Sequence, residues 1–446
     1  MFEIKGKYST ARVMIDGLEE SCVAQIYGFI NHPAFSNPIA IMPDAHAGRG
    51  SVVGFTMELT DRVIPAVIGV DIGCGMRSFN IGKIILLPFD QLDHKIRQRV
   101  PFGKNVHDKP IINMKTDFPW RKVNVLAQKL ALAYGSKFGV SLQLPTFDMD
   151  WFMDKVRAIG GDVGRAINSL GTLGAGNHFQ EVGLSTKGDY WITIHTGSRN
   201  FGKRICEYWQ DRACKKAKRL GKDEHKTLLT DLKAKYKGEE LYRRIKALKE
   251  APETPEAPTE AFSCPDDQRW LEGADAQGYL MDMLFAQIYA EVNRDLIMDA
   301  ILDVLKVDDP IDTIETIHNF VDFQDFIVRK GAIRSYIGER MVIPFNMRDG
   351  ILICSGKSNP EWNFSAPHGA GRVLSRSQAK KHINLEEFRE QMAGIYSTSV
   401  GTGTLDEAPD AYKDARVIEE AIEPTAVILD RIKPLHNMKD SLGADD

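Results

Sequence analysis

Three features of this 446-residue sequence predict a mixed α/β (α+β) fold. Short apolar runs at residues 39–42, 52–55 and 63–70 are bounded by Gly and Asp, which is typical of strands joined by tight turns. Residues 190–195 are β-branched and aromatic, so they predict a further strand that ends at a histidine. Residues 277–305 have the apolar spacing of an amphipathic helix that packs in the core.

Two more helices are predicted at residues 91–100 and 121–134. The hydrophobic fraction of 43% is enough to form a sizeable buried core. The formal net charge of -4 excludes a polycation, so any nucleic-acid site must be a local patch of positive charge.

The cysteines and the amino terminus indicate the compartment. The six cysteines form no CxxC pair, and a chain of this length needs no disulfides, so we expect reduced thiols. The first residues lack a basic segment followed by an apolar stretch, and no run approaches the ~18 uncharged apolar residues of a membrane span. We therefore expect a cytoplasmic protein that is neither secreted nor membrane-spanning.

Residues 215–262 are predicted to form a basic, helical surface insertion followed by a Pro-rich linker. Residues 215–250 contain thirteen Lys or Arg against six Asp or Glu, and the three prolines of residues 251–258 cannot continue a helix. Two interpretations remain open. The insertion is either a solvated helix hairpin or a basic arm that binds phosphates.

Asp71 and Cys74 are candidate metal ligands, because one Gly-rich turn presents a carboxylate and a thiolate that can bridge two cations. His178, His195 and His318 also stand in Gly- or Asn-containing contexts. Together these donors suit Mn, Zn, Fe or Co better than Mg or Ca. The simpler alternative is a small buried cysteine with structural histidines.

His368 is a candidate nucleophile, because two glycines and Arg372 follow it closely and would admit a phosphate. Asp44 could accept a hydrogen bond from one ring nitrogen of such a histidine and leave the other free to attack. A turn with a capping histidine and a turn-forming aspartate are the alternatives. A dinucleotide fingerprint is not favoured, because residues 174–179 lack the final glycine.

Eight segments in this order resemble the RtcB family of GTP-dependent RNA ligases. They are residues 43–48, 69–75, 171–181, 195–199, 318–319, 329–332, 368–372 and 406–414. The resemblance implies one catalytic domain over residues 1–446, with an RtcB-type α/β fold around a deep cleft that holds two Mn(II) ions.

The resemblance also implies roles for individual residues. Cys74 would bridge both ions, His195 and His318 would complete one site, and Asp71 and His178 the other. His368 would be guanylylated, with Asp44 beside it. The residues implied in holding GTP are Asn177, His178, Phe179, Gln180, Glu181, His318, Asn319, Pro344, Phe345, Asn346, Met347, His368, Gly369, Ala370, Gly371 and Lys439.

The implied reaction is the joining of RNA ends. His368 would attack GTP, GMP would pass to an RNA 3′-phosphate, and the 5′-hydroxyl of another RNA end would displace GMP. A 2′,3′-cyclic phosphate would first be opened to the 3′-phosphate. Arg199 and Arg372 would bind RNA or phosphate groups, and the pathway served would be RNA repair or tRNA splicing.

The sequence departs from the family pattern in its nucleotide loop. The family usually carries Pro-Gly-Ser-Met where this chain has Pro344-Phe345-Asn346-Met347, and Ile351 replaces a polar contact. The purine pocket is therefore expected to differ, as in a divergent paralogue. The alternatives to a ligase are a metal-dependent phosphoesterase acting on RNA terminal or cyclic phosphates, and a non-catalytic RNA-binding protein.

Overall fold

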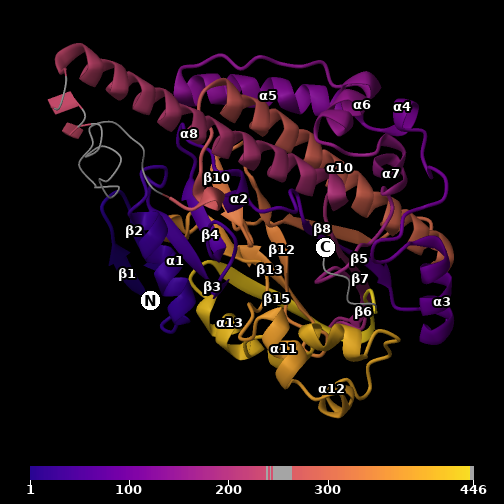
Figure 1. Ribbon diagram of the computed structural model, residues 1–446. Helices are drawn as coiled ribbons and strands as arrows, with labels where there is room; N and C mark the ends of the chain where they lie inside the picture. The colour runs from indigo at the N-terminus through magenta and orange to yellow at the C-terminus, as the bar shows by residue number, and fades with distance from the viewer. Residues whose placement is uncertain (238–239, 242, 245–263, 442–446) are drawn as a thin grey trace.

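The computed structural model describes residues 1–237, 240–241, 243–244 and 264–441. The predicted mixed α/β architecture is confirmed (Figure 1). The helices are α1 (Glu20–Ile30), α2 (Pro65–Ile68), α3 (Phe89–Arg99), α4 (Met114–Asp117), α5 (Trp120–Phe138), α6 (Met149–Ala158), α7 (Val163–Asn168), α8 (Arg199–Lys235), α10 (Ala274–Leu305), α11 (Arg376–His382), α12 (Leu385–Gln391) and α13 (Ala415–Ala421). Short 3-10 helices are η1 (Asp266–Gln268), η2 (Pro360–Trp362), η3 (Thr402–Glu407) and η4 (Pro409–Ala411).

Two large sheets form the centre of the molecule. The seven-stranded sheet is antiparallel throughout, in the order β12 (Arg340–Pro344), β13 (Ile351–Gly356), β15 (Ala426–Met438), β6 (Phe179–Leu184), β7 (Tyr190–Thr196), β5 (Gly75–Gly82) and β8 (Asp312–Ile317). The six-stranded sheet has the order β1 (Phe2–Lys5), β2 (Thr10–Val13), β3 (Ile39–His46), β4 (Val53–Glu58), β10 (Ile327–Lys330) and β9 (Asn319–Val321). Strands β11 (Ala332–Arg334) and β14 (Ser365–Pro367) form a small third sheet.

Helices cover opposite sides of these sheets. Helices α5, α6, α8 and α10 gather on one side, and α11, α12 and α13 lie on the other (Figure 1). The largest apolar cluster includes many side chains of α5, α8 and α10. The core therefore lies mainly beneath the first group of helices, which leaves the ends of the strands available for polar side chains.

The order of four neighbouring strands brings four of the candidate metal ligands to the same end of the sheet. Cys74 directly precedes β5, His178 directly precedes β6, and His318 directly follows β8. His195 lies near the end of β7, opposite the first residue of β6. Because β6, β7, β5 and β8 are adjacent in this order, these four residues meet although they are far apart in the sequence.

Most predicted elements are confirmed, but two predictions are wrong. Residues 63–70 are not a strand, because Pro65 occupies the first turn of α2, where a missing N–H costs nothing. Helix α10 lies in the core as predicted, yet it is not amphipathic in its first half, where all eight side chains of residues 279–286 are buried. Continuous burial of this kind is expected of a helix packed on several sides.

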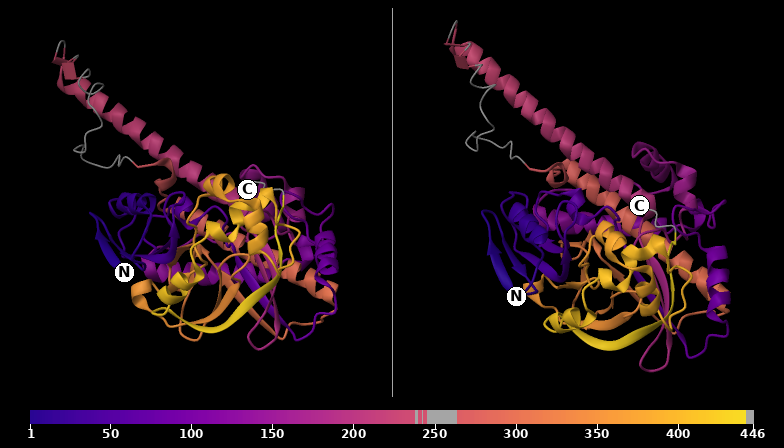
Figure 2. Two further views of the ribbon diagram at one scale, coloured as in Figure 1. Left: turned by 90° about the horizontal axis from the view of Figure 1, so that it is seen from below. Right: turned by 60° about the horizontal axis from the view of Figure 1, so that its bottom comes forward.

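Helix α8 starts earlier than predicted and ends at Lys235, and residues 240–241 and 243–244 of the predicted helical stretch are helical again after a break. It begins at Arg199, and its first half packs into the core through residues such as Phe201 and Ile205. Its second half projects away from the body (Figure 2), and Lys226 and Lys233 are exposed there. Residues 236–237 are not helical, and most of the remaining predicted insertion and its Pro-rich linker lie outside the described residues.

Candidate active site

The candidate metal ligands form two triads that share the sulfur of Cys74. Its Sγ lies 3.5 Å from Nε2 of His178 and 3.3 Å from Nε2 of His195. Asp71 Oδ2 is 3.0 Å from Nε2 of His178, and Nε2 of His195 is 3.3 Å from Nε2 of His318. All five residues that the sequence predicted as ligands are therefore brought together.

The hydrogen bonding of His195 leaves its inner nitrogen free to bind a cation. Nδ1 of His195 is 3.1 Å from the carbonyl oxygen of Asn177, which can only accept, so Nδ1 carries the proton. Nε2 of His195 then presents a lone pair toward both the Cys74 sulfur and the His318 ring. Hydrogen bonds can pair only some of these lone pairs, which belong to the Cys74 sulfur and the two imidazole nitrogens. A metal cation can accept lone pairs from all three atoms at once.

Burial sets the protonation of the cluster. It lowers the pKa of His195 and His318 well below the usual value, with neighbouring cationic groups acting in the same direction, so both rings are neutral at pH 7. Burial and the carboxylate of Asp71 raise the pKa of the Cys74 thiol. Burial opposes ionisation of Asp71, but the contact with His178, a hydrogen bond with Cys74 and the charge of Arg199 together outweigh it and lower the Asp71 pKa. A bound cation would stabilise the thiolate, because metal ligation favours the deprotonated form.

Backbone groups hold the Asp71 carboxylate in place. The N–H of Ser198 donates to Asp71 Oδ1 at 3.0 Å. Gly197 packs so closely against this carboxylate that a side chain at position 197 would overlap it. This close approach is the physical reason for a glycine between His195 and Arg199.

His368 and Asp44 form a second unit beside the metal-binding cluster. Nδ1 of His368 donates to Asp44 Oδ2 at 2.6 Å, and the His368 backbone N–H donates to the same oxygen at 3.1 Å. The His368 ring is 4.8 Å from the His318 ring, centroid to centroid. The alternative of a turn-forming aspartate is wrong, because the fully buried Asp44 lies inside β3, and the predicted hydrogen bond between Asp44 and a histidine is present.

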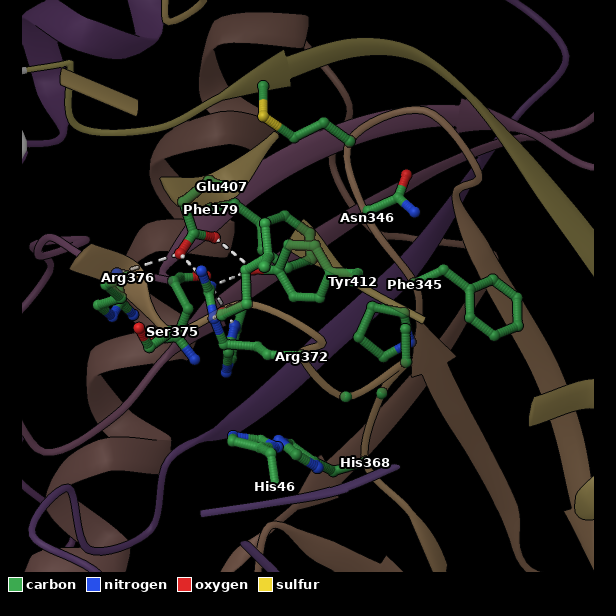
Figure 3. Close-up of a pocket in the computed structure, with 18 of the residues that line it drawn as sticks. His46, Phe179, Phe345, Asn346, His368, Arg372, Ser375, Arg376, Glu407 and Tyr412 are labelled. Atoms are coloured by element: carbon green, nitrogen blue, oxygen red, sulfur yellow. Dashed lines mark hydrogen bonds and ion pairs between the residues drawn. The ribbon is translucent and has the colours of Figure 1, made fainter. Parts of the chain in front are cut away.

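A cavity of about 790 Å³ opens on the His368 side of the cluster (Figure 3). Twelve of the residues predicted to hold a nucleotide line it: Asn177, Phe179, Glu181, Pro344, Phe345, Asn346, Met347, His368, Gly369, Ala370, Gly371 and Lys439. Four predicted residues, His178, Gln180, His318 and Asn319, are not among its lining residues.

Sequence reasoning missed the charged wall of this cavity. Glu407 accepts from Lys439 Nζ at 2.8 Å, from the Tyr412 hydroxyl at 2.7 Å and from Arg376 Nη1 at 3.1 Å (Figure 3). Burial disfavours the Glu407 carboxylate, but Lys439 and the two arginines outweigh it and lower its pKa to about 2. The only signal was the motif at residues 406–414, which has no recognisable catalytic pattern by itself.

The two arginines predicted to bind RNA lie in different cavities. Arg372 lines the first cavity, and its guanidinium already donates to Leu374 O and Glu407. Arg199 lines a second cavity of about 480 Å³, on the Asp71 side of the cluster. The second cavity contains the further cationic residues Lys104, Arg165, Lys203 and Arg204.

The fold and the site define a candidate metalloenzyme, in which one cysteine, one aspartate and three histidines meet between two cavities. Residues 25–440 match the family model described as tRNA-splicing ligase RtcB, so the chain belongs to the RtcB family. The resemblance drawn from the motifs is thereby confirmed.

Relatives in bacteria and archaea match along most of their length. The RNA-splicing ligase RtcB of Escherichia coli (strain K12) is 28% identical over 433 residues, which cover 91% of this chain and 90% of that protein. The RNA-splicing ligase RtcB of Mycobacterium tuberculosis (strain ATCC 25618 / H37Rv) is 26% identical, with 90% of this chain and 95% of that protein covered. The tRNA-splicing ligase RtcB of Methanococcus maripaludis is 25% identical, with 98% of this chain and 95% of that protein covered.

Within the described residues, every helix is too short or too polar to cross a membrane.

Proposed function

We propose that this protein is an RNA ligase that joins a 3′-phosphate or 2′,3′-cyclic phosphate end to a 5′-hydroxyl end, with GTP as co-substrate. The names of its relatives, RNA-splicing and tRNA-splicing ligases, support the ligase class. The proposal depends most on His368, whose ring lies 4.8 Å from the ring of His318 and is held at Nδ1 by the buried carboxylate of Asp44. An imidazole with one free nitrogen thus stands beside a metal-binding cluster.

Two Mn(II) ions are the cations that we propose for the cluster, as the family resemblance implies. Asp71 and His178 would hold one ion, His195 and His318 the other, and Cys74 would bridge both. The donor set fits, because sulfur and neutral imidazoles favour a transition metal over Mg or Ca. The bound ions would supply charge neutralisation at the phosphate oxygens and the leaving group.

His368 acts in this proposal through Nε2. Because Asp44 holds the proton on Nδ1, Nε2 keeps a lone pair that can attack the α-phosphorus of GTP. A nitrogen–phosphorus bond forms while the bond to the β-phosphate oxygen breaks, and pyrophosphate leaves. Asp44 fixes the tautomer and offsets the positive charge that the ring acquires.

The first cavity would hold the guanosine part of the nucleotide. A volume of about 790 Å³ suits a nucleotide, and its lining combines the Phe179 ring with polar groups, as ligand sites usually do. Gly369, Ala370 and Gly371 follow the nucleophile directly and leave room for the phosphates.

The second cavity would admit an RNA end. Arg199 and its cationic neighbours lie on the side of the cluster opposite the nucleotide, where phosphodiester groups would be attracted. An oxygen of the RNA 3′-phosphate would displace His368 from the GMP phosphorus. The 5′-hydroxyl oxygen would then attack the 3′-phosphate phosphorus, and GMP would leave as the junction forms. Arg372 would bind phosphate from the first cavity.

Labelling of the protein by α-³²P-GTP tests this proposal. Wild type incubated with Mn(II) should acquire label that is lost in acid and stable in alkali, as a phosphoramidate is. His368→Ala should acquire none while binding Mn(II) as wild type does. His94 is exposed and is not a lining residue of either cavity. The variant His94→Ala is therefore the control and should be labelled normally.

A phosphoesterase is the second candidate, because the same cluster could activate water without any nucleotide. Three results together would favour the phosphoesterase over the ligase. Wild type would open a 2′,3′-cyclic phosphate end, the protein would take no label from any nucleoside triphosphate, and no RNA would be joined.

For the ligase we further propose a single catalytic domain over residues 1–446, a cytoplasmic location consistent with six free cysteines, and a role in tRNA splicing or RNA repair.

A further inference from the structure

The inner end of the first cavity is built on two paired strands. In the register of β15 and β6, Asn437 lies opposite Glu181, and both residues line the cavity. Phe179 and Lys439 are each two residues away along their strands, so they lie on the same face of the sheet. Lys439 Nζ is 5.3 Å from the centre of the Phe179 ring. Four side chains thus form one continuous floor.

This floor contains two buried acceptor atoms without a partner. Nδ2 of Asn437 donates to Glu181 Oε2 at 2.9 Å. Within the part of the chain that the structure describes, Oε1 of Glu181 and Oδ1 of Asn437 have no hydrogen-bond partner, although their residues are 2% and 1% exposed. This amide orientation is the one that suits an ionised Glu181, because the opposite orientation would place two acceptor oxygens against each other. Unpaired buried acceptors are costly, so a ligand that donates to both would be favoured.

Lys439 adds a donor beside these acceptors. Its ammonium group donates to Glu407 Oε2 at 2.8 Å and to Asn177 O at 3.4 Å. An ammonium has three N–H groups, so one remains for a ligand. The floor therefore offers two acceptors and one donor, which is the complement of the guanine edge with its N1–H, its 2-amino group and its O6. Adenine has an unprotonated N1 and lacks a 2-amino group.

The opposite wall contributes little to base recognition. Both polar atoms of the Asn346 side chain are engaged inside its own loop, with Asp349 and with the N–H groups of Arg348 and Asp349. Phe345 points away from the charged wall (Figure 3) and belongs to an apolar core cluster. Ile351 is apolar. The polar groups that could distinguish one base from another therefore lie in the floor of the cavity.

We infer that Asn437 is a specificity-determining residue whose Oδ1 accepts a hydrogen bond from the 2-amino group of guanine. The inference rests on the proposed use of GTP and adds one residue to it. In this arrangement Glu181 Oε1 accepts from N1–H and Lys439 donates to O6. Asn437 has a second task, because its Nδ2 also orients the Glu181 carboxylate.

Calorimetric titration of the full-length protein with GMP and with IMP tests this inference. IMP has the same edge as GMP except that it lacks the 2-amino group. Wild type should bind GMP roughly 5- to 100-fold more tightly than IMP, because IMP leaves a buried acceptor unpaired. Asn437→Leu, which keeps the approximate size and removes Oδ1, should reduce that ratio to below about twofold. Asn437→Ser guards against misfolding of the leucine variant and should give the same loss of discrimination.

A purely orienting role gives a different result. If Asn437 only held Glu181, its substitution would weaken GMP and IMP by the same factor, and the inference would be overturned. An unchanged ratio in both variants, or no preference for GMP in wild type, would overturn it as well. Asn37→Leu, at a position outside the cavity, should leave the ratio unchanged. Labelling of His368 by GTP is measured separately, so its absence would remove the ligase proposal without deciding which atom reads the base.

Discussion

The cluster of candidate metal ligands and the proposed nucleotide cavity are adjacent but differ in their electrostatics. The cluster is buried and dominated by neutral imidazoles, with donor atoms directed at one another around Cys74. The cavity wall is ionic instead, because Glu407 and Asp406 pair with Lys439 and with the partly exposed Arg376. The cluster is thus incomplete without an added charge, whereas the charges of the cavity wall are already paired with one another. This difference predicts that the two regions respond differently to substitution.

Substitution of Cys74 should have the largest effect. Cys74→Ala removes the one atom that both triads share, so both cations should be lost. Because metal ions supply several kcal/mol of charge stabilisation, labelling of His368 by GTP should fall below about a thousandth of wild type. Metal content by mass spectrometry and the labelling rate check this. Cys214→Ser, outside both cavities, should behave as wild type, and retention of two Mn(II) ions by Cys74→Ala would contradict the shared-ligand design.

The variant Asp44→Asn should have the second largest effect on labelling. It tests the role of His368 without changing the candidate metal ligands. The amide keeps the shape of the carboxylate, and its oxygen can still accept from Nδ1 and the backbone N–H of His368, but it lacks the negative charge that offsets the charge acquired by the ring. The labelling rate should fall about 10²- to 10⁴-fold, as expected when a catalytic histidine loses the carboxylate beside it. Mn(II) content should not change, because Asp44 is outside both triads. Equal loss of metal and rate would mean that Asp44 supports the cluster instead.

Glu407→Gln should reduce stability and nucleotide affinity while leaving the cluster intact. It leaves the buried Lys439 without its counter-charge, while Arg376 retains Asp406, and the loss costs about 3–5 kcal/mol of unfolding free energy. We expect a KM for GTP raised roughly tenfold or more, with Mn(II) content unchanged. Denaturant unfolding and labelling kinetics measure the two effects. Glu423→Gln, which removes an exposed ion pair with Lys357, should change stability by less than about 1 kcal/mol.

The same carboxylate predicts how acid destabilises the protein. The pKa of Glu407 is lowered to about 2 in the folded state, so its stabilising contribution is fully present above the ordinary glutamate pKa. That contribution is lost as the pH falls toward 2. Unfolding of wild type and Glu407→Gln compared between pH 5 and 2.5 should therefore show a stability difference that shrinks on acidification.

The sequence predicted the cluster better than the cavity for a physical reason. Metal ligation needs a few residue types, so Cys74 and His195 were recognisable in Gly-rich contexts. The cavity wall uses common charged residues such as Glu407 and Arg376, whose function appears only when distant segments meet. Asn437 had no distinguishing local context at all. Its importance comes from the register of two strands that are separated by more than two hundred residues.

Errors in the predicted elements have similarly local causes. The apolar run at residues 63–70 looked like a strand, but Pro65 starts a helical turn there. Asp44 looked like a turn residue, yet it lies within β3, where Oδ2 of its carboxylate accepts two hydrogen bonds from the distant His368. A buried polar residue in a strand is expected only where such a partner exists.

The smallest predicted effect concerns Glu181, the least compensated charge of the cavity. Burial raises its pKa to about 8, although Asn437 and Lys439 act in the opposite direction. At pH 7 the carboxyl group is mostly protonated, and it ionises as the pH rises through 8. Since the ionised form is the better acceptor for guanine N1–H, GMP should bind several-fold more tightly at pH 8.5 than at pH 7.

Metal-free protein is the sample for this titration, because ligand deprotonation would add its own pH dependence. Glu181→Gln should abolish the rise in affinity between pH 7 and 8.5, while Asp44→Asn should retain it. Without a nucleotide, ionisation of Glu181 should make the folded state less stable from about pH 4.5 up to 8, because the unfolded chain releases this proton first. If the affinity of wild type for GMP did not change between pH 7 and 8.5, ionisation of Glu181 would not contribute to binding. The base would then be bound by neutral groups, as the candidate cluster is formed by neutral imidazoles.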